Sequence, residues 1–413
     1  MEKYEFKKLS ERGIPIWNKE EWNEIKEKYP KNTFREWMAE FIIETKPEFP
    51  YQKITRTDME QSFFRLLGNR FEDNVFPAFA GEVVAKHNDY KYPFKDGDLV
   101  FRAFHQHNMV SNWFHQKARY KCGHDRFFSP IEIWNNYEKL KKLNYPFWRD
   151  GMVGENGISE VSWRMAFGLG SYIAMQFKPA VAKLVYRHFE AKVICDTSCG
   201  WGDRLAGFYT EHGTERYYGT DPNDEVYETY KKQCLEYERL LGFGIAPEIE
   251  DHGHYFECNG VKKVRIYNLP AEDVNWQEDG CKPFDLIFSS PPYFSTEKYG
   301  VGSAKEENQS WSRYQEYDAW EKDFFFPMLK KAFKNLKLGG SMLINIIDAT
   351  IKGTRHRLCD RFVDHFIDHY DGQMGMEMNK RPRGTMSEED YEKIKNSVMV
   401  ENMWHFIKKG EFQ

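Results

Sequence analysis

The chain has 413 residues, and its 59 Lys and Arg against 64 Asp and Glu give a formal net charge of −5. This length favours two domains, and the negative balance provides no overall positive field that would attract nucleic acid or a membrane surface. A charged fraction of 30% and a mean hydropathy of −0.75 argue against a membrane span. The start of the sequence lacks the apolar core of a signal peptide, so we expect a soluble, cytoplasmic protein.

The seven cysteines are odd in number and contain no CxxC pair, which argues against a disulfide framework or a four-cysteine zinc site. One local group has enough ligand-type residues to interest a metal: His105, His107, His115, Cys122 and His124. Its spacing matches no recognised zinc pattern. We therefore predict no metal site, and expect ordinary polar packing or substrate contact there.

Residues 1–155 have a mainly helical pattern with no regular strand alternation. Its clearest helical stretches are Phe34–Phe41, Gln61–Leu67 and Ile131–Leu143. Glycines and polar residues interrupt the periodicity between Trp148 and Gly157, which is typical of a domain boundary or hinge. The sequence therefore predicts a helical accessory domain over residues 1–155, followed by a second domain over residues 156–413.

Five short apolar runs in the second domain have strand character: Lys192–Asp196, Arg216–Asp221, Val264–Asn268, Phe284–Ser289 and Ser341–Ile347. Helical patterns at Asp224–Leu241 and Trp320–Leu338 alternate with them, and Gly339-Gly340 is expected to end the second helix. Strands that alternate with helices predict an α/β fold, with a parallel sheet covered on both faces.

The last two strand patterns, Gln373–Met378 and Val398–Ile407, follow one another near the end of the chain. The polar loop Arg381–Gly384 lies between them. We expect these two segments to form an antiparallel hairpin that completes the parallel sheet.

A glycine turn follows the first of the five strands, where Asp196-Thr-Ser-Cys199-Gly200-Trp-Gly202 leads into a helix. Glycines at this position let the backbone approach a ligand at the carboxyl edge of a sheet, although a purely structural tight turn has the same pattern. A dinucleotide-binding turn would have a third glycine at position 205, which is Leu205 here. The motif therefore disfavours NAD.

Asp221 ends the second strand, 19 residues beyond Gly202, in the sequence Gly219-Thr-Asp221-Pro-Asn223. A carboxylate at this distance from the glycine turn is placed to bind the ribose of an adenosine-containing cofactor, and the alternative is a helix-capping turn before a proline. Asp273 follows the third strand and is similarly placed to meet an adenine amino group, a role that Glu272 could take instead.

The fourth strand ends in Ser290-Pro291-Pro292-Tyr293. The two prolines cannot continue a sheet ladder, so we expect the carbonyls before them to face the crevice, with Tyr293 beside them. Acceptors next to an aromatic ring suit the exocyclic amino group of a flat base, and the alternative is a simple proline-rich strand stop. The polar segment Ser295–Tyr317 that follows is either a substrate loop or the lead into the next helix.

These motifs resemble the S-adenosylmethionine-dependent amino-methyltransferases of DNA, whose signature is Asp/Asn/Ser-Pro-Pro-Tyr. The segment Gln176–Lys183 resembles the helix that covers the methionine end of the cofactor in that family, and the motif order is similar to its gamma-like arrangement. The resemblance covers residues 160–413, and two stretches are also similar to uncharacterised methylase-like proteins of large phages. One departure is Asp196-Thr197-Ser198, where the family usually has Asp-Pro-Phe.

The resemblance implies a Rossmann-like class I methyltransferase that uses S-adenosyl-L-methionine and acts on a flipped base in DNA. Its leading serine is the form most associated with N4 of cytosine, and the catalytic residues carried over are Ser290, Pro291, Pro292 and Tyr293. The residues expected to bind the cofactor are Phe177, Lys178, Pro179, Asp196, Cys199, Gly200, Gly202, Asp221, Asn223, Glu272, Asp273 and Ser289.

Three alternatives remain open: N6-adenine methylation, an RNA or protein-glutamine methyltransferase, and a catalytically silent DNA-binding module. C5-cytosine methylation is disfavoured, because none of the cysteines follows a proline. An acidic protein must concentrate its cations to hold phosphates, and the alternative for any one cation is a solvated face. The candidates for DNA contact are Lys117, Arg119, Lys121, Arg126, Arg355, Arg357, Arg381 and Arg383.

Overall fold

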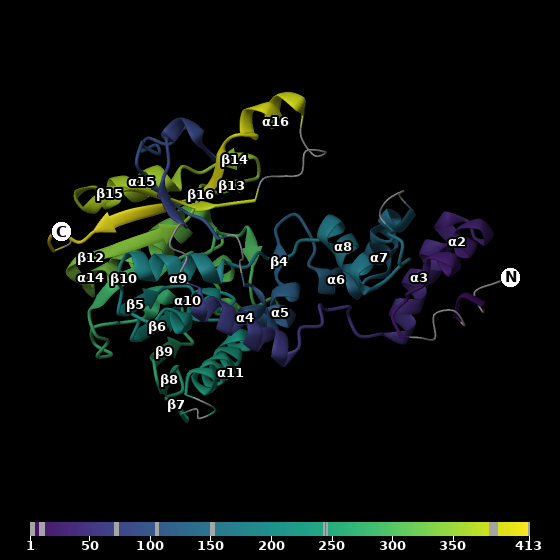
Figure 1. Ribbon diagram of the computed structural model, residues 1–413, viewed down its shortest axis with the longest axis horizontal. Coiled ribbons are helices and arrows are strands. Elements are labelled where there is room, and N and C mark those ends of the chain that lie inside the picture. The colour runs from purple at the N-terminus through teal and green to yellow at the C-terminus, as the bar shows by residue number, and fades with distance from the viewer. Residues whose placement is uncertain are drawn as a thin grey trace. The chain divides into compact units, whose positions relative to one another are not determined.

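The computed structural model describes residues 5–7, 13–69, 74–103, 107–148, 153–242, 244, 247–379 and 387–411 (Figure 1). Its contacts divide the chain into two compact units. The helical unit consists of Met1–Ile54 and Gln116–Met175, and the sheet unit consists of Thr55–His115 and Gln176–Gln413. This division differs from the predicted boundary between residues 155 and 156. None of the described helices combines the length and the apolar character needed to cross a membrane.

The helical unit packs around an aromatic core that includes Phe34, Trp163 and Phe167. Its helices include α2 (Lys19–Lys28), α3 (Lys31–Thr45), α6 (Pro130–Trp134), α7 (Tyr137–Leu143) and α8 (Glu160–Gly170). Capping boxes start three of them, at Asn18 before α2, at Ser129 before α6 and at Ser159 before α8. The helical patterns predicted at Phe34–Phe41 and Ile131–Leu143 are confirmed, the second as two helices.

The sheet unit is built on a twelve-stranded sheet in the order β1-β3-β15-β16-β12-β10-β5-β6-β9-β8-β7, with β2 beside β16. Its parallel centre consists of β12 (Leu336–Asn345), β10 (Phe284–Ser289), β5 (Val193–Asp196), β6 (Arg216–Thr220) and β9 (Lys263–Tyr267). These are the five predicted strands, and the central ones lie side by side in Figure 1. The predicted Rossmann-like α/β fold is confirmed.

The last two strands, β15 (Tyr370–Glu377) and β16 (Val398–Ile407), pair antiparallel as predicted. β16 also pairs antiparallel with β12 and so joins the pair to the parallel centre. The connection between the two strands contains a helix, α16 (Glu388–Ile394), which the sequence interpretation missed.

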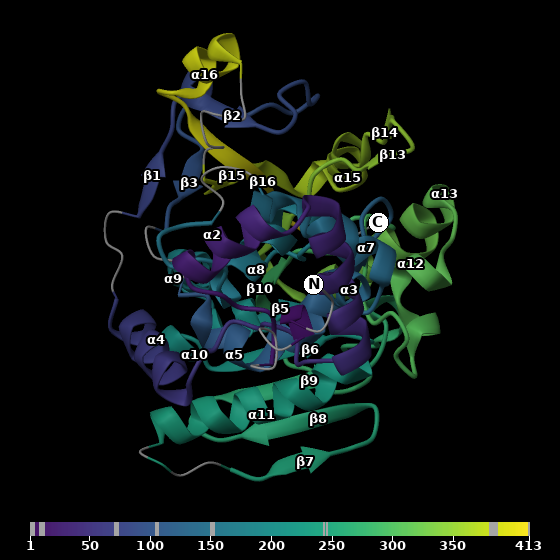
Figure 2. The same ribbon diagram turned by 90° about the vertical axis from the view of Figure 1, so that its right-hand side faces the viewer.

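Helices cover both faces of the sheet because neighbouring strand residues point to opposite sides. On one face, Cys195 and Ile287 belong to a core shared with α14 (Phe326–Lys334) and α15 (Leu358–His365). On the other face, the ring of Phe288 lies 5.8 Å from that of Tyr186. Tyr186 is part of α9 (Pro179–His188), which packs against α10 (Asp203–Thr210). Figure 2 shows α11 (Asp224–Leu241), predicted with the same bounds, running along β8 and β9.

Residues 1–155 are mainly helical as predicted, but the sequence interpretation missed short strands in this stretch. Three strands of three residues each, β1 (Val75–Pro77), β2 (Val83–Ala85) and β3 (Leu99–Phe101), extend the sheet. β3 pairs with β15 and β2 with β16, which is why this stretch clusters with the sheet unit. Runs this short show no measurable alternation in the sequence.

The predicted role of Gly339-Gly340 as a helix stop is also wrong. A π-helical stretch (η5, Trp320–Phe325) leads into α14, which already ends at Lys334, and both glycines belong to β12. There they exchange backbone hydrogen bonds with Lys408, next to β16, and Gly339 has a φ of 77°. A glycine favours this bend because side chains disfavour positive φ.

The remaining elements are short or peripheral to the parallel centre. They are α4 (Arg56–Gly68), α5 (Met109–Lys121), β4 (Gly123–His124), β7 (Ile249–Asp251), β8 (Tyr255–Asn259), β11 (Glu297–Lys298), α12 (Ser310–Arg313), α13 (Tyr317–Ala319), β13 (Thr350–Ile351) and β14 (Thr354–Arg355).

Candidate functional site

A pocket with about 610 Å³ of empty space opens at the carboxyl edge of the parallel strands. Residues after β5, β6, β9 and β10 line it, together with part of the segment Ser295–Tyr317 and Phe324. Among the predicted site residues, the pocket brings together Gly200, Asp221, Asn223, Ser290 and Pro292. Ligands of open α/β sheets bind at this edge, so the pocket is the candidate cofactor site.

Asp221 directly follows β6, lines the pocket and is partly exposed. It accepts hydrogen bonds from the backbone N–H of Gly200 at 3.1 Å, the backbone N–H of Asn223 at 3.0 Å and the hydroxyl of Tyr230 at 3.1 Å. Burial raises the pKa of Asp221 to about 6, although these three hydrogen bonds lower it. The carboxylate is ionised at neutral pH and can accept further hydrogen bonds from a diol.

Asp196, at the end of the neighbouring strand, is fully buried and does not line the pocket. Its carboxylate accepts from Arg204 Nε at 2.8 Å, from the Tyr217 hydroxyl at 2.6 Å and from Ser289 Oγ at 2.8 Å. Burial lowers the pKa of Arg204, and Asp196 outweighs this effect so that the pKa is raised. Asp196 and Ser289, both predicted to bind the cofactor, therefore hold the strand ends together.

The glycine turn has the conformation that its residues require. Gly200 and Gly202 have φ values of 60° and 69°, and a Cβ on Gly202 would lie 2.2 Å from Oε1 of Gln233. Cys199, another predicted cofactor residue, is buried beneath the turn, where its Sγ would lie 2.3 Å from a Cβ on Gly219. Gly200 lines the pocket, whereas Cys199 is buried and packs beneath the turn.

Several pocket residues were missed by the sequence interpretation. Trp201, Pro270, Ala271 and Phe324 form apolar walls that suit a flat purine. Two buried polar side chains in the wall have an atom without a hydrogen-bond partner among the described residues: Oγ1 of Thr197 and Nε2 of Gln309.

An unpaired polar group costs free energy unless a ligand or water satisfies it, so the Thr197 and Gln309 atoms indicate a polar ligand. Carboxylate, apolar walls and unpaired polar atoms together fit an adenosine-containing cofactor. Gln309 belongs to the polar segment Ser295–Tyr317 after the Pro-Pro-Tyr motif. The sequence interpretation singled out this segment but left its function open.

The Ser290-Pro-Pro-Tyr293 motif directly follows β10, at the carboxyl end of the strand. Ser290 and Pro292 line the pocket, and the half-buried Tyr293 donates a hydrogen bond from its hydroxyl to Oε1 of Glu401 at 2.7 Å. Burial raises the pKa of Tyr293 well above its usual value, Glu401 raises it further, and a side-chain hydrogen bond with Ser290 lowers it. The following residue, Phe294, is buried. Its φ of 53° is uncommon outside glycine and marks a sharp turn of the backbone after the motif.

Five predicted cofactor residues make other contacts. Asp273 and Glu272 both bind Arg313, at 2.6 and 3.1 Å, and neither lines the pocket. Phe177 packs against Phe288 at 5.5 Å, Lys178 donates to the backbone carbonyl of Glu377, and Pro179 begins α9. Burial lowers the pKa of Lys178, whereas Glu377 and Glu401 raise it.

Most of the predicted DNA-contacting cations have partners within their own unit. In the sheet unit, Arg355 pairs with Asp348 and Asp89, and Arg357 pairs with Asp360 and Asp89. In the helical unit the contacts are Arg119 with the carbonyl of Ala174, Arg126 with Asp125, and Lys117 over the ring of Tyr51. Lys121 also has a partner, and Arg381 and Arg383 lie outside the described residues.

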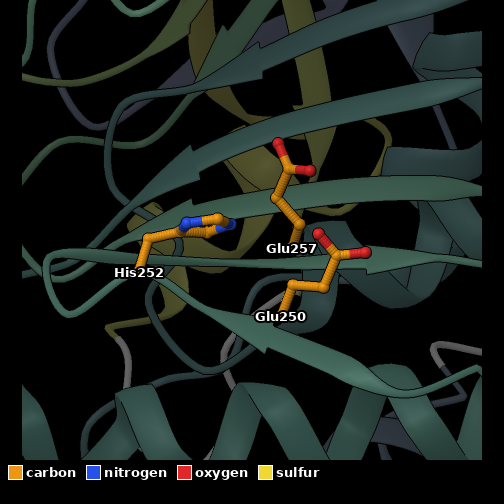
Figure 3. Close-up of side chains that lie close together, drawn as sticks. All are labelled: Glu250, His252 and Glu257. Atoms are coloured by element: carbon orange, nitrogen blue, oxygen red, sulfur yellow. The ribbon is translucent and has the colours of Figure 1, made fainter.

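The histidine-rich group of the sequence includes His105, which lies outside the described residues. His115 is buried against Oε1 of Gln233 at 2.8 Å, and burial lowers its pKa to about 4. Among the described residues, one group of side chains could hold a metal ion, and it lies elsewhere, at Glu250, His252 and Glu257 near β7 and β8 (Figure 3). Its Glu257 is already paired with Arg265.

The model of the DNA methylase family, of the N6/N4 amino-methyltransferase type, matches residues 284–412. The matched region begins at β10 and includes Ser290-Pro-Pro-Tyr293 and every strand after it. This region is therefore similar to the DNA methylase family. The predicted resemblance and the predicted cofactor are confirmed at this level. A search of curated proteins finds no match to the chain.

Solved methyltransferases with low sequence identity are also similar to parts of the chain. A complex of Trm1 from Pyrococcus horikoshii with S-adenosyl-L-methionine is 15% identical over 41% of this chain and 37% of its own, with a TM-score of 0.27. A SAM-dependent O-methyltransferase from Thermotoga maritima is 11% identical over 62% and 74%, with a TM-score of 0.33. An rRNA methylase from Streptococcus thermophilus is 11% identical over 58% and 100%, with a TM-score of 0.30. The assignment does not depend on these likenesses.

Proposed function

We propose that the protein transfers a methyl group from S-adenosylmethionine to the exocyclic amino group of a base in DNA, at N4 of cytosine. The observation that carries this proposal is the position of Ser290 and Pro292 on the wall of a pocket that also presents Asp221. A carboxylate suited to the cofactor ribose and the residues suited to a base amino group thus line the same pocket. The family match over residues 284–412 supports DNA as the substrate class.

The chain offers matching groups for the adenosine part of the cofactor. Asp221 binds the ribose hydroxyls, and the apolar walls around Ala271 and Phe324 hold the adenine. Thr197 and Gln309 each supply a polar atom of the pocket wall that has no hydrogen-bond partner among the described residues. When bound, S-adenosylmethionine supplies an electrophilic methyl group.

The residues of the Pro-Pro-Tyr motif orient the base. Enzymes that modify a base take it out of the helical stack, and the Tyr293 ring holds the flipped base by stacking, which is worth about 1–3 kcal/mol per base. Ser290 and the Pro291 carbonyl accept hydrogen bonds from the amino group and direct its nitrogen toward the methyl group. Catalysis then depends mainly on positioning.

Cytosine is preferred over adenine in this proposal because of Ser290. Stacking on Tyr293 is available to either base, whereas a leading serine resembles the cytosine-N4 members of the family. The roles of the remaining regions are also proposals: residues 1–155 contribute to DNA recognition, and the predicted basic residues hold phosphates. Binding that depends on phosphate contacts weakens steeply with salt.

Mass spectrometry of nucleosides tests the proposal. Unmethylated DNA is incubated with the protein and S-adenosylmethionine, digested and analysed, with a Tyr293→Ala sample as the control. We expect N4-methylcytosine from the wild type and none from the variant. N6-methyladenine as the only product would contradict the choice of base, and full activity of Tyr293→Ala would contradict the site.

A further inference from the structure

The hydroxyl of Tyr293 donates to Glu401, a residue 108 positions away in the sequence. Glu401 lies on β16, opposite Met376 of β15, and is not part of the pocket wall. The contact therefore joins the Pro-Pro-Tyr motif to the antiparallel strand pair at the end of the chain. No sequence motif indicates it, because the two residues meet only when β16 has joined the sheet.

The direction of this hydrogen bond limits what Tyr293 can do. An ionised carboxylate only accepts hydrogen bonds, so the proton of Tyr293 is committed to Glu401, and its oxygen keeps its lone pairs for another donor. The hydrogen bond therefore fixes the direction of the Tyr293 hydroxyl and holds the side chain in place.

We propose that Glu401 is a positioning residue of the methyl-transfer site, which holds the Tyr293 ring in the orientation that receives the substrate base. This inference rests on the proposed amino-group methylation but not on the choice between cytosine and adenine. The half-buried charge of Glu401 has a nearby counterpart in Lys178, at the start of α9, whose pKa Glu377 and Glu401 both raise.

A double-mutant cycle tests the proposal in the full-length protein. Tyr293→Phe keeps the ring and removes the hydroxyl, and Glu401→Gln keeps the shape and can donate as well as accept. Each variant is expected to slow single-turnover methyl transfer by roughly 10- to 100-fold, the range for a hydrogen bond to a charged group. The affinity for S-adenosylmethionine is expected to remain within about twofold of wild type, since Glu401 does not line the pocket.

The coupling between the two positions distinguishes positioning from a general structural effect. In a Tyr293→Phe background, Glu401→Gln is expected to have no further effect on the rate, because the hydroxyl through which Glu401 acts is gone. Glu377→Gln is the matched control: its carboxylate pairs with Arg102, which directly follows β3, and the rate should remain at the wild-type value.

A wild-type rate in Glu401→Gln, or independent effects that multiply in the double variant, would overturn the proposal. If Glu401→Gln does not fold, as judged by thermal denaturation, Tyr293→Phe decides alone, and its wild-type turnover would overturn the proposal. Failure of the proposed function is a separate result, because the wild-type protein itself would then transfer no methyl group to DNA.

Discussion

Asp196 ends β5 and Asp221 directly follows the neighbouring strand β6, and the structure uses the two carboxylates in opposite ways. Asp196 is fully buried, and its oxygens are occupied by Arg204, Tyr217 and Ser289. Asp221, one strand away, is held by two backbone N–H groups and a hydroxyl and lines the pocket. One carboxylate therefore stabilises the protein and the other is available to a ligand.

The comparison shows that position at the carboxyl edge of a sheet does not by itself identify a ligand-binding residue. Asp196 has a buried cation as its partner, whereas Asp221 has no cationic partner in the part of the chain that the structure describes, and burial raises the pKa of Asp221 to about 6. A carboxylate kept ionised without a countercharge carries an electrostatic cost that a binding site can use. Each prediction below tests whether the two residues differ in this way.

The largest expected effect is that of Asp196→Asn on stability. The substitution leaves the buried Arg204 guanidinium without its counter-charge, and breaking a buried pair from one side costs about 3–5 kcal/mol. Chemical denaturation of the protein without cofactor measures the loss. A variant as stable as the wild type would show that the Asp196–Arg204 pair does not hold the strand ends together.

The second effect is that of Asp221→Asn on cofactor affinity. Loss of charge-assisted hydrogen bonds to the ribose, about 1.5–3 kcal/mol each, should weaken the binding of S-adenosylmethionine by at least tenfold. The stability of the free variant should remain at or above that of the wild type at neutral pH, because a buried, unpaired charge is removed. Calorimetric titration and thermal denaturation measure the two quantities. Unchanged affinity with an intact fold would remove the ribose assignment.

The third effect is that stability and cofactor affinity depend on pH in opposite directions. The folded-state pKa of Asp221 is about 6 and lies above its ordinary value of 3.8, so its contribution to stability is complete below about pH 4 and is lost as the pH rises through 6. Cofactor affinity should change in the opposite direction and weaken as the pH falls through 6. Titrations of wild type and Asp221→Asn between pH 5 and 8 compare the two, and an equal pH dependence in both would assign the effect to another group.

The smallest effect is expected for the two unpaired polar side chains of the pocket wall. Gln309→Ala and Thr197→Val each remove one neutral hydrogen bond to the cofactor, worth about 0.5–1.5 kcal/mol, and should weaken binding by a few-fold. Ser303→Ala provides a control, because Ser303 belongs to the same segment but does not line the pocket. If this control weakens binding as much as Gln309→Ala does, the segment acts through its conformation instead.

The parallel centre of the sheet could be predicted because each strand is a short apolar run followed by a turn. β10 has the predicted bounds Phe284–Ser289, and β5 and β6 differ from prediction by one residue at one end. The strands of residues 75–101 could not be predicted, because they are three residues long and are stabilised by pairing with β15 and β16, which lie far away in the sequence.

In the candidate site, too, some residues could be predicted from the sequence and others could not. Gly200, Asp221 and Ser290 could be predicted because each follows a strand that ends at the same edge of the sheet. The opposite roles of Asp196 and Asp221 could not, because the partner of Asp196 is Arg204, a residue inside the next helix that the glycine pattern does not single out. Glu401 could not be predicted either, since its partner lies 108 residues away.

A crystal structure of the protein with S-adenosylmethionine tests the central claim most directly. We predict that the ribose hydroxyls donate hydrogen bonds to the carboxylate of Asp221, that the adenine lies between the walls near Ala271 and Phe324, and that Asp196 still binds Arg204 and contacts no cofactor atom. A ribose bound by Asp196 or by any group other than Asp221, or a cofactor bound outside this pocket, would contradict the account.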